Sequence, residues 1–457
     1  MPSRFHVQKI AIIGAGPSGL AAAKYLLAQR AFSEVLLFEQ QHDIGGVWLP
    51  SPAEPHCPVP QTDPFLPPEE LVKLPGPRPG SVCFPSAVYD HLRANIIGPL
   101  MQFSDEPFPS TSRVFPSCED IRACIRRYGS DVRHLVRFSQ QVISLELLQD
   151  YNRWRLCAQD VHSGDVTDHV FDAVVVATGH YSVPFIPDIN NMAAFHNVHP
   201  SVIIHSKQYR NPESFRNKKV LVVGNGPSGI DIASQINAVS KGRTLLSVRS
   251  ATSSENLAFL GCDEVPEIID FLVDKRAVRF KDGRLESNID AIVFCTGFLF
   301  SYPFLKNIPS KLITNGRGVH GLYKHLFYAQ HPTLVFPGLL MRSVPWPVSE
   351  VQAAAFAAVW SNELDLPEAE EMQTWSRDLY MRVGEPLHTL PPGGNFQYIN
   401  DLHDWVIKAS YLGKEPPRWS DLCGRQHLHM HEARRRFQEQ GCQAMTWREL
   451  GFQNESN

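Results

Sequence analysis

Residues 9–40 read KIAIIGAGPSGLAAAKYLLAQRAFSEVLLFEQ, in the order strand, glycine turn, helix, strand. The apolar run 10–13 predicts a buried parallel strand, and residues 17–29 predict a helix with an alanine-rich face. Glycines at such a turn allow a sharp bend, close approach of the backbone to a pyrophosphate, and close packing of helix on strand. The pattern predicts a dinucleotide-binding Rossmann unit whose turn consists of Gly14, Ala15, Gly16, Pro17, Ser18 and Gly19.

A carboxylate ends the second strand of this unit. Glu39 lies 20 residues after Gly19, with Gln40 beside it. In this position a carboxylate can accept hydrogen bonds from both hydroxyls of a ribose. The first unit therefore suits a nucleotide with a free ribose, such as FAD. Glycine turns also occur without a ligand, but here strand, spacing, helix and acid all agree.

The same pattern returns at residues 218–250, KKVLVVGNGPSGIDIASQINAVSKGRTLLSVRS. Its turn consists of Gly224, Asn225, Gly226, Pro227, Ser228 and Gly229. Arg249 stands 20 residues after Gly229, at the offset that Glu39 has in the first copy. A guanidinium can hold a 2′-phosphate through paired hydrogen bonds, and Ser250 adds a hydroxyl donor. We therefore expect NADPH at the second unit; the alternative is that Arg249 is a surface charge at a strand end.

Two dinucleotide units with opposite ribose preferences indicate a flavoenzyme that NADPH reduces. The bulk composition agrees with a globular enzyme: 457 residues suggest two or three domains, with 43% apolar and 20% charged residues. A net charge of −4 gives no field that would attract nucleic acid. Nine scattered cysteines without a CxxC pair predict neither a disulfide framework nor a dithiol centre. No apolar run is long enough for a membrane span and no signal peptide is evident, so we expect a cytoplasmic protein.

Further motifs follow these two units. The chain contains DIGGVW (43–48), LRANIIGPLMQFSDEPFP (92–109), FDAVVVATGHYSVPFIP (171–187), HSKQYR (205–210), DAIVFCTGFLFSYPF (290–304) and VSEVQAAAFAAVW (348–360). Together with the two glycine fingerprints, they resemble the flavin-containing monooxygenase family over nearly the whole chain. The layout is most similar to the shorter microbial members, including the fungal thiol-oxidising enzymes.

The resemblance implies an α/β fold of two Rossmann-like domains, with the NADPH domain inserted into the FAD domain. In the family, ATG and CTG segments such as 177–179 and 295–297 mark the crossings between the domains. The expected boundaries are 1–181 for the first part of the FAD domain, 182–296 for the NADPH domain, and 297–457 for the second part of the FAD domain.

The resemblance also assigns roles to single residues. Asn95 matches the family's active-site asparagine, which faces the flavin and the nicotinamide amide, although its local sequence alone favours a helix or turn cap. An amide suits this role because it donates and accepts hydrogen bonds without carrying a charge. Further residues expected on the flavin side are Gly46, Val47, Trp48, Ala94, Val142 and Gln352, of which Val142 would meet the adenine through its backbone.

The family signature F-x-G-x-x-x-H-x-x-x-Y/F is only half intact. His205 and Tyr209 match it, whereas His199 and Ser201 replace the expected Phe and Gly. We expect His205 to fix the linker between the domains rather than to transfer protons. Tyr209 separates the chain from the related Baeyer–Villiger enzymes, which usually carry Trp at this position.

Two other stretches have a local explanation. Residues 50–80 are rich in proline and predict an extended, solvent-facing loop near the entrance of the active site. His427, His429 and His431 are spaced two apart in a predicted helix, so they would not share a face, and no metal site is predicted.

The resemblance implies a monooxygenase that forms a flavin hydroperoxide and oxygenates a thiol or sulfide sulfur, or an amine nitrogen, of a small molecule with O2. One alternative is a Baeyer–Villiger or hydroxamate-forming flavin oxygenase of a biosynthetic pathway. Others are an NADPH-dependent flavoprotein reductase without oxygenase activity and a non-catalytic dinucleotide-binding protein. A homodimer is among the assembly states that the resemblance allows.

Overall fold

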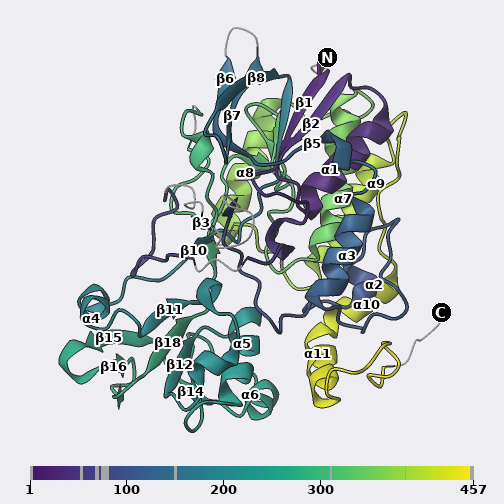
Figure 1. The fold of residues 1–457 in the computed structure, drawn as a ribbon. Helices are drawn as coiled ribbons and strands as arrows, with labels where there is room; N and C mark the ends of the chain where they lie inside the picture. The colour runs from purple at the N-terminus through teal and green to yellow at the C-terminus, as the bar shows by residue number, and fades with distance from the viewer. Residues whose placement is uncertain are drawn as a thin grey trace.

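The computed structural model describes residues 4–51, 55–66, 72–73, 82–148, 152–308, 311–385 and 387–452. Two α/β units of unequal size lie next to each other (Figure 1). The larger unit contains the two ends of the described chain and a seven-stranded sheet, and the smaller one contains a five-stranded sheet from its middle.

The seven-stranded sheet has β1 near its centre. Its strands, in spatial order, are β20 (Leu322–Tyr323), β21 (Phe327–Tyr328), β22 (Leu334–Val335), β9 (Ala173–Val176), β1 (Lys9–Ile13), β2 (Glu34–Phe38) and β5 (Val136–Arg137). From β22 to β5 all neighbours are parallel. The predicted strand at 10–13 is confirmed, and its residues are buried because both faces of the sheet are covered.

Helices cover one face of this sheet. Ile10 and Ile12 of β1 pack toward α1 (Pro17–Gln29), and α7 (Pro345–Trp360) packs on α1. Every residue of α7 from Trp346 to Trp360 is buried, which is typical of a helix inside a core. The other helices of this unit are α2 (Gly98–Met101), α3 (Cys118–Tyr128), α8 (Ala369–Val383), α9 (Gly394–Val406), α10 (Asp421–Leu428) and α11 (Met430–Glu439).

An antiparallel sheet covers the opposite face. It consists of β6 (Gln140–Leu148), β7 (Arg153–Asp160) and β8 (Val166–Phe171). Ala11 and Ile13, which alternate with the helix-facing residues of β1, pack into its core with the fully buried Trp154. The indole N–H of Trp154 donates to Thr333 Oγ1 at 3.0 Å, which joins this sheet to the loop before β22.

The five-stranded sheet is parallel throughout and resembles the first in its turn and helix. Its spatial order is β11 (Ile203–His205), β18 (Ala291–Phe294), β12 (Val220–Val223), β13 (Leu245–Ser247) and β14 (Asp263–Val265). One face packs on α5 (Pro227–Asn237) and α6 (Ser254–Leu260). The other packs on α4 (Met192–Val198) and a small sheet of β15 (Ile268–Leu272), β16 (Ala277–Phe280) and β17 (Leu285–Glu286).

Two crossing segments connect the units and pair with each other. β10 (Val183–Pro184) runs antiparallel to β19 (Phe298–Leu299). Phe185 N donates to Gly297 O at 2.9 Å, and the Thr296 hydroxyl donates to Phe185 O. The chain thus leaves and re-enters the larger unit at one place, which supports an insertion; the domain boundaries themselves stay a prediction.

The described part of the proline-rich stretch faces solvent with only some of its residues. Cys57 lies in the hydrophobic core of the smaller unit beside Ile186, and buried Gln61 forms a β-bridge with Ile186. The expectation of a solvent-facing loop is therefore wrong for Cys57, Gln61 and Pro64, which are buried, whereas His56, Thr62, Asp63 and Phe65 are exposed. Residues 52–54, 67–71 and 74–80 of this stretch lie outside the described residues.

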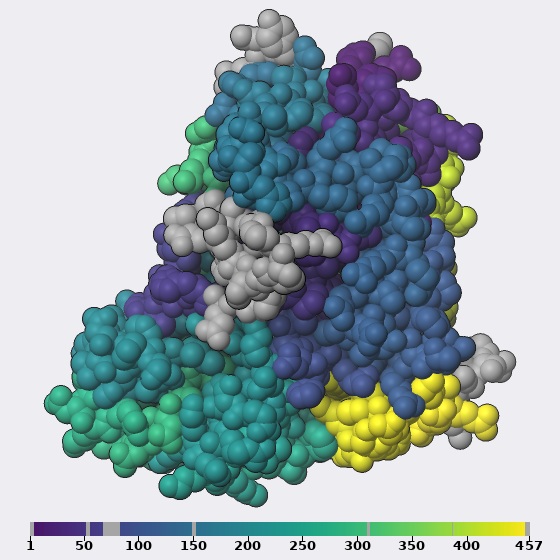
Figure 2. Space-filling view, in the orientation of Figure 1, coloured from purple at the N-terminus to yellow at the C-terminus, as the bar shows by residue number. Residues whose placement is uncertain are grey.

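The C-terminal helices contact the smaller unit. Arg434 and Arg435 of α11 form ion pairs with Asp231 (3.4 Å) and Glu255 (3.7 Å), and Figure 2 shows the C-terminal segment in yellow against the teal smaller unit. The short elements are β3 (Val72–Lys73), β4 (Val82–Cys83) and the 3-10 turns η1 (Gly46–Trp48), η2 (Arg133–Leu135), η3 (Ser206–Gln208), η4 (Pro212–Phe215), η5 (Val273–Lys275) and η6 (Pro303–Leu305). In the described chain, no helix combines the length and apolar character that a membrane crossing needs.

Candidate functional site

The first glycine turn is packed so tightly that side chains would not fit. Gly14 has φ +101°, and a Cβ there would lie 2.6 Å from Ala177 O at the end of β9. A Cβ on Gly19 would lie 1.9 Å from Gly14 O. The helix starts directly after this turn, with Gly16 extended and Pro17 at its first position. The turn therefore presents free backbone N–H groups of α1 beside the ends of β1 and β9.

Glu39 points back to this turn. It is buried, and its two carboxylate oxygens accept hydrogen bonds from Ala15 N (2.7 Å) and Gln41 N (2.8 Å). Burial raises the pKa of Glu39, and the backbone N–H groups oppose this shift. The neighbouring Gln40 accepts a hydrogen bond from Gln141 at 3.4 Å. The acid thus lies where the sequence predicts it, at the strand end beside the turn.

Two other segments pack against the first turn. Gly45 N donates to Ala15 O at 3.1 Å, and a Cβ on Gly46 (φ +57°) would lie 3.0 Å from Gly16 Cα. The same 3-10 turn carries Val47, whose carbonyl accepts a hydrogen bond from Ser86, and the half-buried Trp48. On the other side, Ser18 Oγ is 2.8 Å from Ser349 Oγ of α7. The predicted flavin-side residues Gly46, Val47 and Trp48 are therefore next to the turn.

The second glycine turn repeats this geometry. Gly224 has φ +104°, and its Cβ would lie 2.8 Å from Cys295 O at the end of β18. A Cβ on Gly229 would lie 1.9 Å from Gly224 O. Gly226 differs, because a Cβ there would meet no protein atom within 4 Å. Protein packing does not require glycine at 226, so the open space fits a bound group such as a dinucleotide pyrophosphate.

Hydrogen bonds fix the loop that carries Arg249 and Ser250. Asn225 Nδ2 of the turn donates to Ser250 O and to Thr252 Oγ1, both at 3.0 Å. Thr252 N donates to Glu264 Oε2 at 2.9 Å. Arg249 is exposed and forms no hydrogen bond or ion pair with another described residue. Its charge is thus held beside the second turn without a counter-ion from the described chain. Pro227 and Ser228 begin α5 and are exposed.

Asn95 is available to a ligand. Its side chain is exposed and forms no hydrogen bond within the described ranges, and α2 begins at Gly98 with Ile97 before it. It is therefore not the cap of that helix. Ala94 beside it is buried, with its N–H bonded to Pro116 O at 2.9 Å and its carbonyl to Arg434 at 3.1 Å. The backbone around Asn95 is thus fixed while its amide is free.

Gln352 and Val142 are buried. Gln352 Oε1 accepts from Gly338 N, and its Nε2 donates to Tyr398 Oη, both at 2.8 Å. Val142 lies in β6 paired with Ala158. Both ends of the Gln352 amide are therefore hydrogen-bonded within the protein. They fix the Gly338 loop close to Ser18 of the first turn.

His205 and Tyr209 lie at the crossing. His205 is fully buried; its Nε2–H donates to Gly297 O at 3.0 Å, and its Nδ1 accepts from Lys207 N at 3.1 Å. Burial lowers the pKa of His205 to about 4, so the ring is neutral. Tyr209 is buried and donates to Gln235 Oε1 at 2.9 Å. These contacts support a role in fixing the linker. His199 is 3.0 Å from Val273 O; Ser201 is exposed.

Sequence reasoning missed two polar residues at the first crossing. The hydroxyl of Thr178 and both ring nitrogens of His180 are buried without a hydrogen-bond partner within the described ranges. Burial lowers the pKa of His180 to about 4. Buried polar groups are normally paired, so these atoms fit contact with a bound polar molecule at the end of β9. The signal available in the sequence was their place directly after the apolar strand, in ATGH (177–180).

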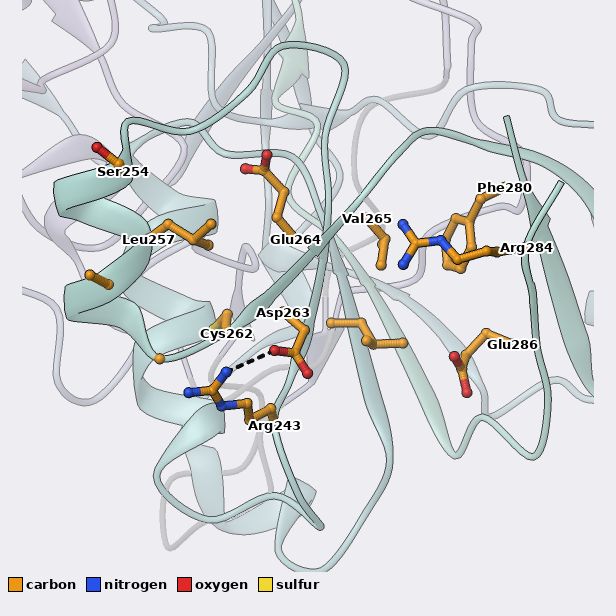
Figure 3. Close-up of a pocket in the computed structure, with 13 residues that line it drawn as sticks. Arg243, Ser254, Leu257, Cys262, Asp263, Glu264, Val265, Phe280, Arg284 and Glu286 are labelled. Carbon is orange, nitrogen blue, oxygen red and sulfur yellow. Dashed lines mark hydrogen bonds and ion pairs between the residues drawn. The ribbon is translucent and has the colours of Figure 1, made fainter. Parts of the chain in front are cut away.

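A pocket at the edge of the smaller unit lies apart from both turns. Its lining comes from the start of β13, from β14 and α6, and from β16 and β17 (Figure 3). Arg243 and Asp263 form an ion pair at one end of it, at 3.0 Å. No residue of either glycine turn lines it, so we assign it no catalytic role. Within the described ranges, no group of three or more His, Cys, Asp or Glu residues could hold a metal ion.

Comparison with known proteins identifies the family. The model of the flavin-binding monooxygenase-like family matches residues 85–255 and 261–382, and that of an NAD(P)-binding Rossmann-like domain matches residues 12–59. The chain belongs to the flavin-binding monooxygenase family. This monooxygenase is 32% identical to the thiol-specific monooxygenase of Saccharomyces cerevisiae, over 91% of the chain and 89% of that protein.

Two further relatives of this monooxygenase cover most of its length. It is 31% identical to flavin-containing monooxygenase FMO GS-OX-like 9 of Arabidopsis thaliana, over 88% of the chain and 87% of that protein. The solved structure of S-allyl-L-cysteine S-oxygenase from Allium sativum superposes with a TM-score of 0.80 and 26% identity, covering 98% of both chains. The chain is thus a flavin-dependent monooxygenase with FAD and NADP(H) as cofactors, as the paired turns predict.

Proposed function

We propose that this monooxygenase transfers one oxygen atom from O2 to the sulfur of a small thiol or sulfide, or to an amine nitrogen, at the expense of NADPH. The observation that carries the proposal is the pair of glycine turns with the same shape and opposite charges. Glu39 adjoins the first turn and Arg249 the second. The names of two relatives, a thiol-specific monooxygenase and an S-allyl-L-cysteine S-oxygenase, favour sulfur.

The first turn fits FAD. The free N–H groups at the start of α1 suit its pyrophosphate, and Glu39 suits a ribose. Gly46, Val47 and Trp48 would border the cofactor, and the orphan hydroxyl of Thr178 would find a partner there. FAD, once reduced by NADPH, supplies the activation of O2. The protein's own groups bind, orient and exclude water.

The second turn fits NADPH, and we propose 182–296 as its domain. The space at Gly226 would receive the pyrophosphate, and Arg249 with Ser250 the 2′-phosphate. The chain enters and leaves this unit at one crossing, where His205 is bonded to Gly297 O. A neutral His205 with both nitrogens engaged holds the crossing and does not move a proton.

Asn95 is the residue we assign to the reacting centre. Its free, neutral amide can donate to one partner and accept from another without introducing a charge. Thiols and sulfides are themselves nucleophiles, so this reaction needs no serine, cysteine or histidine nucleophile from the protein. This agrees with the absence of an acid–base pair among the candidate site residues.

The test follows labelled oxygen into products. The FAD-loaded enzyme receives NADPH, ¹⁸O-labelled O2 and, in separate reactions, a thiol, a sulfide, an amine or a ketone. We expect one labelled oxygen on the sulfur of the sulfide or the nitrogen of the amine for each NADPH consumed. With the thiol we expect a disulfide formed in the presence of catalase, because the sulfenic acid first formed condenses with a second thiol and its oxygen leaves as water. A labelled ester from the ketone would instead indicate Baeyer–Villiger chemistry. NADPH oxidation with neither a labelled product nor a disulfide formed in the presence of catalase would overturn the proposal in favour of a reductase.

A further inference from the structure

A second arginine reaches the region of Arg249 from the larger unit. Arg317 lies in the loop before β20, and its guanidinium stacks on the ring of Phe185, with Cζ 3.8 Å from the ring centroid. Phe185 belongs to the first crossing segment, bonded to Gly297 of the second at 2.9 Å. Arg317 N donates to Asn315 Oδ1 at 3.0 Å. The guanidinium is therefore held in place at the junction of the two units.

The packing of the preceding residue fixes this loop to the same junction. Gly316 has φ +76°, and a Cβ there would lie 2.8 Å from the Cβ atoms of both Leu299 and Pro64. Gly316 O accepts a hydrogen bond from Phe300 N at 2.8 Å. Because β19 and the described end of the proline-rich segment both contact Gly316, the loop cannot shift independently of the crossing.

Contacts through the crossing place Arg317 near the loop that carries Arg249. Arg317 stacks on Phe185, whose carbonyl accepts from the Thr296 hydroxyl, and Cys295 before Thr296 packs against Gly224 of the second turn. Asn225 of that turn donates to Ser250 O at 3.0 Å.

Burial, and then the charge of Arg249, lower the pKa of Arg317, while Glu385 acts in the opposite direction. The carboxylate of Glu385 accepts hydrogen bonds from Asn315 Nδ2 at 2.9 Å and forms no ion pair with Arg317. Neither arginine has an ion-pair partner among the residues described. Two like charges that face one region repel each other, and an anion bound between them would remove that repulsion.

We propose that Arg249 and Arg317 together form a clamp, with one arginine from each unit, that binds the 2′-phosphate of NADPH. The clamp rests on the proposed function, because it takes NADPH as the nucleotide of the second turn. A phosphate offers oxygens enough for two guanidinium groups, each with charge-assisted hydrogen bonds. The 2′-phosphate would then connect the NADPH unit to the larger unit, so that cofactor choice also depends on a residue outside the NADPH unit.

The proposed clamp is distinct from the neighbouring pocket, because the charged residues of that pocket have partners of their own. Glu264 points away from the Arg243–Asp263 ion pair, at the other end of the pocket (Figure 3), and accepts from Thr252 N. Arg243 thus has its own carboxylate, whereas Arg249, two residues after β13, has none. This makes Arg243 a matched control: it is an arginine of the same unit, exposed like Arg249, and already neutralised.

The experiment compares two mononucleotides that differ only in the 2′-phosphate. Isothermal titration of the FAD-loaded full chain with 2′,5′-ADP and with 5′-AMP measures both affinities for Arg317→Gln, Arg249→Gln and Arg243→Gln. We expect Arg317→Gln and Arg249→Gln each to weaken 2′,5′-ADP about 10-fold or more and to leave 5′-AMP within about twofold. Arg243→Gln should change neither affinity. Arg317→Lys keeps the charge and should weaken 2′,5′-ADP by only about threefold.

Each result supports or overturns the clamp. If Arg317→Gln leaves the ratio of the two affinities unchanged while Arg249→Gln lowers it, the clamp is wrong and the NADPH site of the proposed function stands. If neither variant changes the ratio, both the clamp and the NADPH site of the proposed function are wrong. Equal weakening of both nucleotides by Arg317→Gln would mean a general effect on the site and would also overturn the clamp. If Arg317→Gln does not fold, the ratio of the two affinities is measured for Arg317→Lys instead, and an unchanged ratio overturns the clamp.

Discussion

Gly226 and Gly229 allow the binding role of the second turn to be separated from its structural role. Gly226 has φ −71° and ψ 179°, a conformation open to any residue, and a Cβ there meets no protein atom within 4 Å. Replacing glycine by alanine at such a position restricts the unfolded chain and stabilises the fold by about 0.4–1 kcal/mol. We therefore expect Gly226→Ala to fold normally, with a free energy of unfolding equal to or above that of the wild type.

The same methyl group should weaken NADPH binding. It would occupy the space that we assign to the pyrophosphate, and overfilling a packed contact costs about 1–3 kcal/mol, or roughly 5- to 150-fold in Kd. Gly229→Ala gives the contrast, because its Cβ would lie 1.9 Å from the carbonyl oxygen of Gly224. Since this neighbour is backbone and cannot turn away, we expect a loss of about 3 kcal/mol or more in stability.

Urea unfolding of the FAD-loaded variants and NADP⁺ titration, done in parallel, measure the two quantities. Gly226→Ala should lose affinity and keep stability, whereas Gly229→Ala should lose stability. If Gly226→Ala binds NADP⁺ as tightly as the wild type, the pyrophosphate does not lie at this turn and the assignment of the second unit is wrong. If Gly226→Ala unfolds more easily by more than about 1 kcal/mol, the open space is needed for packing.

Two further predictions concern stability. Burial raises the pKa of Glu350 in α7 from 4.5 to about 7, against hydrogen bonds from Ser104 N and Oγ at 2.8 Å. The folded chain then holds a proton that the unfolded chain releases between pH 4.5 and about 7, so stability should fall by up to about 3 kcal/mol as pH rises through this range. Glu350→Gln should remove that dependence; an unchanged pH profile would show that Glu350 is ionised throughout. Trp154→Phe should lower the free energy of unfolding in urea by about 1–3 kcal/mol, because Thr333 loses its buried donor at 3.0 Å. Thr333→Val should then lower it less in the Trp154→Phe background than it does alone. Fully additive effects would contradict the pairing.

Local patterns carried most of what could be predicted from the sequence. The helix at 17–29 and both glycine turns follow from residues within about 20 positions of each other, because each turn sets its own backbone geometry. Arg317 could not be found in this way. It stacks on Phe185 only because the chain crosses twice between the units, and no local pattern in the sequence predicts that contact.

Burial was harder to predict than local structure. The proline-rich stretch was expected to face solvent, yet Cys57 fills the core of the smaller unit. Proline restricts the backbone and says little about which surface an extended segment covers. Similarly, the orphan nitrogens of His180 depend on the enclosure that Phe300 and other distant residues provide.

Anaerobic reduction tests the central claim, that one chain holds FAD at the first turn and NADPH at the second. The FAD-loaded protein is mixed with NADPH in the absence of O2, and the flavin absorbance is followed while the NADPH concentration is raised. We expect NADPH to bleach the flavin completely at a rate that saturates, and NADH to need a concentration roughly 10-fold higher or more for the same rate. A flavin that stays oxidised with NADPH, or is reduced equally by NADH at the same concentrations, would contradict the account.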